Sequence, residues 1–519
     1  METNKIAKFL NLERVMLLGF ILAKLVLSLL PISYGIFRDE FYYLSMSKHL
    51  GLGHVDVPPV SPLILAGVRF LFGDSLFALH LIPALSGALF LILAYLLVKK
   101  LNGNRFALFL TLTAVLLFPY IVAVDSIYTY DTFNKLCWLL FSFLMIRLIQ
   151  TEDPKYWIYI GITSGVAMLF KITILYLGFG WIIGLLVTKQ RKLLFRREVL
   201  WAGVLFLIIQ SPSMLWQIQH GFLSGEYYRN YASGKVTSFS LPGYLLFQAI
   251  WMSPLTFPIC LVGLYYFLFH PQGKILRSAG ITYLVILLLS YFTKAKPDLI
   301  LPYYAILLAG GCLWLGNLLS GGGKRWLQAA VFLLVVISGL VVLPMARPVL
   351  PVKTLIKIYG LISTQDVEGH ALPKLPQNFA DRFGWQEMTR KVAEVYHSLP
   401  AADRVKACIL AGNYGEAGAI EFYGKKYGLP LPPVSGHNQY YIWGPGRFSG
   451  EVVITVGISF DNIVNMGNGI VKLNYQDIQK GPILTNPYMM PYEKANPIYV
   501  CRKPLKRFQE MKPWPKWFN

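Results

Sequence analysis

The segment Leu76–Val98 reads LFALHLIPALSGALFLILAYLLV and contains no Asp, Glu, Lys or Arg. A stretch of this length and composition can cross about 30 Å of hydrocarbon as one α-helix. Comparable segments recur at Val199–Trp216, Tyr244–His270 and Trp326–Pro344. Of the 519 residues, 55% are hydrophobic and 14% are charged, whereas a soluble domain averages about 25% charged residues. The sequence therefore predicts a polytopic α-helical membrane protein.

The apolar segments predict about eleven membrane-spanning helices. They lie at roughly residues 12–32, 77–98, 106–122, 133–150, 155–170, 172–188, 199–216, 243–269, 279–293, 299–318 and 326–345. An odd number of spans places the two ends of the chain on opposite sides of the membrane. Lys and Arg gather in alternate loops, and cytoplasmic loops carry such an excess. We therefore expect a cytoplasmic N-terminus, a transmembrane domain at 1–346 with an external loop at 33–73, and an external α/β domain at 347–519.

The basic charge of the chain is widely distributed. The formal net charge is +22, and the Lys and Arg residues are spread over loops and both halves of the sequence. A nucleic-acid-binding protein concentrates its basic residues in one patch or stripe. We therefore expect membrane lipids and lipid-linked phosphates as partners, and no nucleic acid. The oligomeric state is left open by the sequence.

The external loop contains an acidic pair followed by aromatic residues, Asp39-Glu40-Phe41-Tyr42-Tyr43. A carboxylate held at the level of the lipid headgroups can act as general base toward an acceptor hydroxyl. Asp39 and Glu40 are therefore candidate catalytic residues. The alternative is an acidic turn exposed to water, which is the commoner role of an isolated Asp-Glu pair.

Later in the same loop, Asp56 precedes Pro58-Pro59, which fix the backbone and exclude a helix. A rigidly placed carboxylate suits a divalent cation, with His54 and Asp131 of the next external loop as further ligands. The sequence thus allows a Mg²⁺, Mn²⁺ or Zn²⁺ site. A histidine such as His54 is more often hydrogen-bonded than metal-bound, and Asp125 and Asp131 equally suit helix capping.

Basic residues also occur in the predicted external loops. Lys294 and Lys296 precede a late apolar segment, and Arg229 follows two tyrosines. Cations at an external helix entry can hold a phosphate group. The alternative is snorkelling, in which the charged end of the side chain reaches for water at the membrane interface.

The sequence after residue 346 has an ordinary polar composition and predicts an α/β domain. The expected elements are a helix at 385–399, a strand at 405–411, a helix at 419–423 and a strand at 451–459. A Gly-rich turn at 412–418 links the first strand to its helix. Its glycines do not form the GxGxxG pattern, and Glu416 would repel a phosphate, so we do not expect nucleotide binding.

Two loops of this domain, at 435–441 and 443–447, combine aromatic rings with amide and hydroxyl groups. Such a mixture suits sugar recognition by stacking and hydrogen bonding, although ordinary turns and aromatic packing explain it equally well. The candidate sugar-binding or acceptor-binding residues of the whole chain are Tyr42, Tyr43, His437, Asn438 and Trp443.

Several short motifs occur in a defined order along the membrane half. They are Asp39–Tyr43, Asp56–Pro59, Asp131, Lys296-Pro297 and Ile300–Pro302. In this order they resemble the GT-C glycosyltransferases of the protein O-mannosyltransferase superfamily, which includes bacterial aminoarabinose transferases of lipid A. Residues 379–385 and 413–418 further resemble the C-terminal region of many bacterial members.

The resemblance implies transfer of a sugar from a polyprenyl-phosphate donor to a lipid, protein or glycan hydroxyl outside the bacterial cytoplasmic membrane, with inversion at the anomeric carbon. Asp39 would be the base that activates the acceptor, with Glu40 its neighbour in the motif. Asp56 and Asp131 match acidic residues that bind a divalent ion in some members, and Lys296 matches a lysine that holds the donor phosphate.

Departures from the family pattern leave the sugar open. Val57 and Leu299 stand where the aminoarabinose transferases have a lysine and a tyrosine. Two other functions remain possible on the sequence, a transporter or flippase of polyprenyl-linked glycans and a membrane-anchored sugar-binding protein without catalysis. A transporter is expected to show an internal repeat and ionisable residues at mid-membrane, whereas the acidic residues discussed above cluster at one predicted face.

Overall fold

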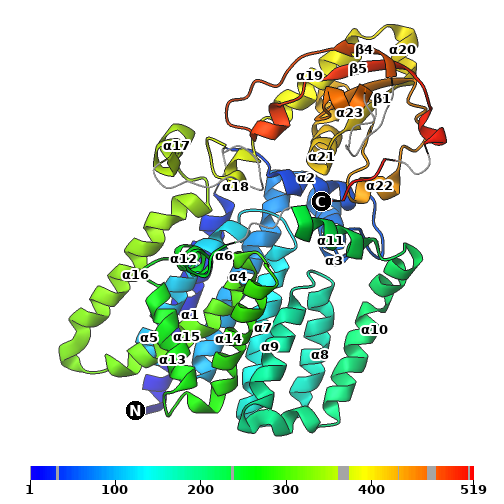
Figure 1. The fold of residues 1–519 in the computed structure, drawn as a ribbon. Coiled ribbons are helices and arrows are strands. Elements are labelled where there is room, and N and C mark those ends of the chain that lie inside the picture. Colours follow the sequence, from blue (N-terminus) through cyan, green and yellow to red (C-terminus); the bar gives the residue numbers. More distant parts are fainter. Residues whose placement is uncertain are drawn as a thin grey trace. The chain divides into compact units, whose positions relative to one another are not determined.

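The computed structural model describes residues 2–30, 34–234, 239–360, 373–430, 432–464, 475–511 and 515–518 (Figure 1). The chain divides into two compact units. The first unit comprises Met1–Pro31, Leu71–Leu215 and Thr237–Arg347, and the second comprises Ile32–Phe70, Trp216–Val236 and Pro348–Asn519. Most of the external loop expected at 33–73 is therefore grouped with the C-terminal residues rather than with the membrane helices.

The first unit is built from apolar helices whose lengths range from 6 residues in α6 to 28 in α1. They are α1 (Glu2–Leu29), α4 (Leu76–Lys100), α5 (Arg105–Leu116), α6 (Pro119–Val124), α7 (Asp131–Thr151), α8 (Lys155–Met168), α9 (Ile174–Leu186), α10 (Glu198–Gln219), α12 (Leu241–Met252), α13 (Phe257–Leu268), α14 (Arg277–Phe292), α15 (Tyr304–Leu318) and α16 (Arg325–Ala346). Short 3₁₀ turns lie at η1 (Lys189–Phe195), η2 (Lys274–Leu276), η3 (Pro297–Tyr303) and η4 (Gly322–Lys324).

Six helical segments in the described part of the chain are long and apolar enough to cross a membrane, and a seventh span results if one bent pair is counted. Helices α5, α8 and α9 have 12, 14 and 13 residues and fall short of that length. The multi-pass character is confirmed, while the number of eleven spans stays a prediction.

The prediction of one continuous helix over 243–269 is wrong. Helices α12 and α13 meet at an angle of 107°. Pro254 lies in the break and Pro258 in the first turn of α13. Proline removes a backbone donor and disfavours helical geometry in the residue before it. Ser253 has a positive φ of 87°, and its hydroxyl donates to Ser338 Oγ of α16 over 2.6 Å.

The second unit contains a five-stranded sheet in the order β2-β1-β3-β5-β4. Its strands are β1 (Ala407–Ala411), β2 (Pro433–Val434), β3 (Val452–Val456), β4 (Tyr475–Lys480) and β5 (Tyr499–Pro504). Strand β1 runs parallel to β2 and β3, and β5 runs antiparallel to β3 and β4. Every residue of β1 and β3 is buried, as expected for continuous apolar runs in central strands.

The helices of this unit are mostly short. They are α2 (Arg38–Met46), α3 (Val60–Phe72), α11 (Leu223–Gly234), α17 (Val352–Gly360), α18 (Gln377–Ala380), α19 (Trp385–Ser398), α20 (Ala401–Lys406), α21 (Tyr414–Tyr423), α22 (Gln439–Trp443) and α23 (Phe460–Val464), with 3₁₀ turns η5 (Gly424–Tyr427), η6 (Pro491–Lys494) and η7 (Phe508–Glu510). The predicted helix at 385–399 and the two predicted strands are confirmed with shorter strand bounds, and the predicted helix at 419–423 begins earlier, at Tyr414.

Helix α2 packs directly against α21. The two helices approach closely at Gly418, where a Cβ atom would lie 2.8 Å from the backbone of Phe41. A side chain at this position is excluded by backbone atoms that cannot turn aside. The glycine of the Gly-rich turn thus serves helix packing, and this packing brings the start of α21 to the start of α2.

Candidate functional site

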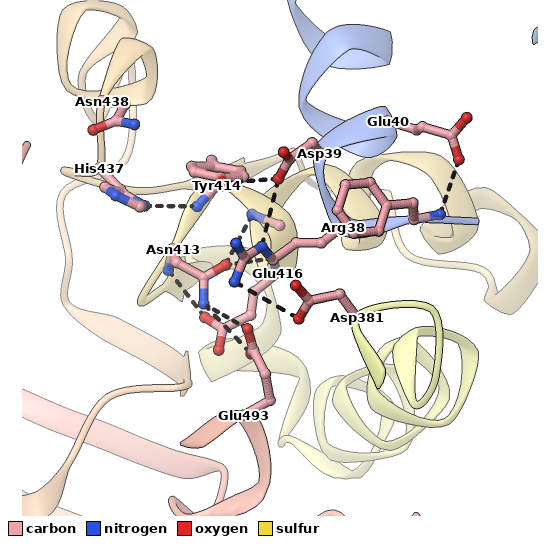
Figure 2. A network of polar contacts seen from close by, with 12 residues as sticks. Arg38, Asp39, Glu40, Asp381, Asn413, Tyr414, Glu416, His437, Asn438 and Glu493 are labelled. Carbon is pink, nitrogen blue, oxygen red and sulfur yellow. Dashed lines mark hydrogen bonds and ion pairs between the residues drawn. The ribbon is translucent and has the colours of Figure 1, made fainter. Parts of the chain in front are cut away.

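Asp39, in the first turn of α2, is held by a residue of the C-terminal segment, which we define as Pro348–Asn519. The Tyr414 hydroxyl donates a hydrogen bond to Asp39 Oδ1 over 2.8 Å, and Arg38 Nε lies 3.5 Å from the same oxygen (Figure 2). The Asp39 side chain retains 34% of its exposure. It is therefore anchored on one side while remaining reachable from solvent.

Glu40 points away from Asp39 (Figure 2). Its carboxylate accepts a hydrogen bond from the Phe37 backbone N–H over 2.9 Å, and the residue is fully buried. This contact satisfies one of the free backbone donors at the start of α2. The geometry thus gives Glu40 a capping role, which the sequence interpretation as a catalytic residue did not anticipate.

Arg38 joins Asp39 to further residues of the C-terminal segment. Its guanidinium contacts the Tyr492 hydroxyl, lies 3.7 Å from Asp381 Oδ1 and covers the Tyr414 ring at 5.6 Å from the centroid. Burial disfavours the charge of Arg38, but Asp381 and its other neighbours raise the pKa well above the ordinary value. Arg38 is therefore a permanent positive charge beside Asp39.

Asp56 accepts two hydrogen bonds from side chains. Tyr42 donates its hydroxyl to Oδ1 over 2.7 Å, and Asn438 donates its amide to Oδ2 over 2.8 Å. Burial raises the pKa of Asp56 to about 6, although both hydrogen bonds favour the ionised form. A carboxyl group with this pKa changes charge close to neutral pH. The backbone N–H of Val55 also donates to Gln439, which ties the loop to α22.

Four rings form an aromatic column, which we define as Tyr42, Tyr414, His437 and Trp517. Successive ring centroids lie 4.6, 4.9 and 6.3 Å apart, and all three pairs are stacked. His437 Nδ1 also accepts the backbone N–H of Tyr414 over 3.1 Å. The column therefore fixes the Tyr414 ring from both faces, between a residue of α2 and a residue of the loop before α22.

The Gly-rich turn is closed by its own side chains. Asn413 caps α21, and Glu416 accepts the N–H groups of Gly412 and Asn413 over 2.8 and 3.1 Å. Glu493 lies next to Glu416 and accepts from the Asn413 amide. Burial and the proximity of the two carboxyl groups raise the pKa of Glu416. The backbone donors that would cradle a phosphate are thus already engaged within the protein.

The predicted metal ligands belong to both units, His54 and Asp56 to the second and Asp131 to the first, and a divalent-cation site stays a prediction. His54 is buried, its Nδ1 lies 3.2 Å from the Val57 carbonyl oxygen, and burial lowers its pKa to about 4. Both Asp56 oxygens accept protein donors, and Asp131 belongs to the first unit. Within the described ranges, no group of three or more His, Cys, Asp or Glu residues could hold a metal ion. We therefore derive no chemical step through a metal.

In the first unit, Asp131 forms an ion pair that the sequence analysis missed. Lys171 Nζ lies 2.8 and 2.9 Å from the two Asp131 oxygens and 4.5 Å from the centre of the Tyr130 ring. Asn134 donates to Asp131 over 3.3 Å. The sequence contained a signal for Lys171, because it is a single lysine between two apolar segments on the predicted external face.

Asp125 is the centre of a second missed cluster. Lys24 of α1 and Lys135 of α7 each place Nζ 2.5 Å from an Asp125 oxygen, and all three side chains are buried. Ser86 of α4 accepts a further hydrogen bond from Lys135 over 2.9 Å. Asp125 therefore does not cap the next helix, but ties helices of the first unit together. The lysines within apolar segments were the available signal.

The chain is similar to a known protein family and to solved structures. Residues 56–216 match the family described as dolichyl-phosphate-mannose-protein mannosyltransferase. The structure of ArnT from Cupriavidus metallidurans bound to undecaprenyl phosphate aligns over 93% of this chain and 97% of its own, with a TM-score of 0.58 and 15% identity. The apo structure of the same protein aligns over 94% and 97%, with the same score and identity. No curated protein sequence matches the chain significantly.

The chain has a GT-C fold. The expectation drawn from the ordered motifs is thereby confirmed at the level of the fold. The family match begins at Asp56 and includes Asp131 and Lys171, but it does not reach Asp39 or the C-terminal segment.

The residues predicted to bind phosphate in this GT-C protein are divided between the two units. Lys294 and Lys296 are exposed at the end of α14 and before η3, whereas Arg229 is exposed on α11 of the second unit. A shared phosphate site for all three stays a prediction. Tyr43 is buried, and the centroids of the Trp443 and His49 rings lie 4.6 Å apart with the rings tilted by 39°. Their role in sugar binding likewise stays a prediction.

Proposed function

We propose that this GT-C protein is an integral-membrane glycosyltransferase of the bacterial cytoplasmic membrane. It transfers a sugar from a polyprenyl-phosphate donor to an external hydroxyl on a lipid, a glycan or a protein. The observation that carries the proposal is the placement of Asp39, a partly exposed carboxylate fixed by Tyr414 and Arg38. The match of residues 56–216 to the mannosyltransferase family and the fold shared with a protein solved with undecaprenyl phosphate support it.

The proposed reaction is one direct displacement. The acceptor oxygen attacks the anomeric carbon, and the bond between that carbon and the phosphate oxygen breaks. The acceptor proton passes to Asp39, and polyprenyl phosphate leaves with the electron pair of the broken bond. A single displacement inverts the anomeric configuration.

Asp39 is the best placed of the candidate bases. Glu40 is fully buried and engaged as a cap, and both oxygens of Asp56 accept protein hydrogen bonds. A general base must come within hydrogen-bonding distance of the proton that it removes. Among these three carboxylates, only Asp39 combines one anchored oxygen with substantial exposure.

The departing phosphate requires positive charge. Lys294, Lys296 and Arg229 are the proposed residues for this purpose, and their exposure leaves them accessible to a lipid-linked phosphate. The N-terminus on the cytoplasmic side and the C-terminal segment on the external side complete the proposed arrangement. A divalent cation remains a proposal to be tested with a chelator.

The test is transfer of radiolabelled sugar from a panel of polyprenyl-phosphate donors by the purified full-length protein in lipid nanodiscs. We expect turnover of at least one donor by the wild type, and a loss of at least about 100-fold in Asp39→Asn, because the base is removed. Asp477→Asn, which changes an exposed carboxylate of β4, is the matched control and should retain activity. Parallel reactions with a chelator test whether transfer requires a divalent cation.

An inactive wild type would contradict the proposal. If the same protein carried intact donors across reconstituted vesicles, the transporter function would replace it. Binding of donor without turnover or transport would favour the non-catalytic sugar-binding protein.

A further inference from the structure

We infer that Tyr414 of the C-terminal segment is a positioning residue for the Asp39 base. This inference rests on the proposed glycosyltransferase function and adds a residue that lies outside the matched family region, 375 positions from Asp39 in the sequence. It assigns to the C-terminal segment a part in the chemistry, beyond the recognition of an acceptor.

The side-chain hydrogen bond and the nearest cation of Asp39 are both on one oxygen. Tyr414 donates to Oδ1, and Arg38 approaches the same atom. From the described residues, Oδ2 receives no hydrogen bond. With Oδ1 fixed, the carboxylate cannot rotate freely, and Oδ2 is held ready for the proton of an acceptor hydroxyl. Such fixing of a reacting group lowers the entropy that must be lost in the transition state.

Tyr414 is itself held on every side. Its ring lies in the aromatic column between Tyr42 and His437, its backbone N–H donates to His437, and the Arg38 guanidinium covers the ring. The residue also opens α21, whose N-terminus is capped by Asn413. The phenol hydroxyl therefore has a fixed position, as a positioning group requires.

A tyrosine hydroxyl in a packed region can also be merely structural, and Tyr440 offers a matched control. Tyr440 is buried in the same unit, stacks on Tyr42 at 6.2 Å and donates its hydroxyl to Ser45 over 2.8 Å. It makes no contact with Asp39 or Asp56 among the described interactions. Tyr440→Phe and Tyr414→Phe therefore remove the same atom from the same packed region.

The experiment measures kcat, KM for the donor and thermal unfolding of wild type, Tyr414→Phe, Tyr440→Phe and Asp39→Asn in nanodiscs. For Tyr414→Phe we expect kcat to fall about 10- to 100-fold because the base is less well oriented. Its donor KM should stay within about threefold, since the ring remains in place. Tyr440→Phe should keep kcat within about threefold, and both tyrosine variants should unfold within about 4 °C of each other.

Each result bears on one inference or both. If wild type transfers sugar and Asp39→Asn does not, the proposed function stands. A Tyr414→Phe variant with the kcat of wild type, or a kcat loss equal to that of Tyr440→Phe, then overturns the positioning role alone. A wild type that transfers no sugar overturns both.

Discussion

Replacing Asp56 with Asn measures how much the buried negative charge of Asp56 destabilises the folded protein. Burial raises the pKa of Asp56 from its ordinary value of 3.8 to about 6. The folded protein then binds this proton more tightly than the unfolded chain. The free energy of unfolding therefore falls as the pH rises from about 4 to about 6, and the total loss is about 3 kcal/mol at higher pH.

The Asp56→Asn variant does not carry this loss. Its side-chain oxygen can still accept from Tyr42, and the Asn438 amide can turn to present its own oxygen. We expect the variant to be more stable than the wild type, with an advantage that grows by about 1.5 kcal/mol between pH 5 and pH 8. If Asp56 holds the proposed divalent cation, the transferase activity of the variant should fall, because the cation loses a carboxylate ligand.

The measurement is thermal unfolding of both proteins at pH 5 and pH 8, followed by tryptophan fluorescence, with Asp477→Asn as an exposed control. Comparing each variant with wild type at the same pH cancels the titration of all other groups. A stability difference that is the same at both pH values would refute the reasoning, because the folded state would then not favour protonated Asp56.

Two further substitutions test the packing and the ion pairing of the site. Gly418→Ala places a methyl group 2.8 Å from the backbone of Phe41 and should destabilise the protein by about 1–3 kcal/mol in thermal unfolding, with loss of transfer. The control is Gly225→Ala, on a helix with open space around the glycine, which should change neither stability nor transfer. Equal effects of the two substitutions would contradict the close approach. Lys171→Met leaves the Asp131 carboxylate without its ammonium partner and should lower stability by about 1–2 kcal/mol and reduce transfer, whereas Lys171→Arg should retain most of both. A Lys171→Met variant that behaves as wild type would show that the ion pair is dispensable.

The fold class was predictable because its signals are local. Segments such as Leu76–Val98 are apolar over the length of a span, and the structure contains a helix there. The strand at 407–411 and the helix at 385–398 follow from runs and periodicities of a few residues. The bend between α12 and α13 was predictable in principle from Pro254 and Pro258, but the high hydropathy of the whole segment concealed it.

The candidate base was predictable for the same reason, whereas its partners were not. Asp39 lies in a short motif, but the sequence contains nothing that links it to Tyr414, 375 residues away. Likewise, Asn438 was recognised only as part of a polar loop, and its hydrogen bond to Asp56 depends on how the loop before α22 is folded. Pairing between distant segments is a property of tertiary structure, and one sequence shows no covariation.

The order of residues in the Gly-rich turn nevertheless has a physical explanation once both helices are known. Tyr414 and Gly418 are four residues apart on α21, so they lie on the same face of the helix. Gly418 admits the backbone of Phe41, and Tyr414 then reaches Asp39 two residues earlier on α2. A larger residue at 418 would move the hydroxyl of Tyr414 away from the carboxylate. The spacing therefore suits contact with an acidic residue on a neighbouring helix, and not with a phosphate, because Glu416 already occupies the backbone donors of the turn.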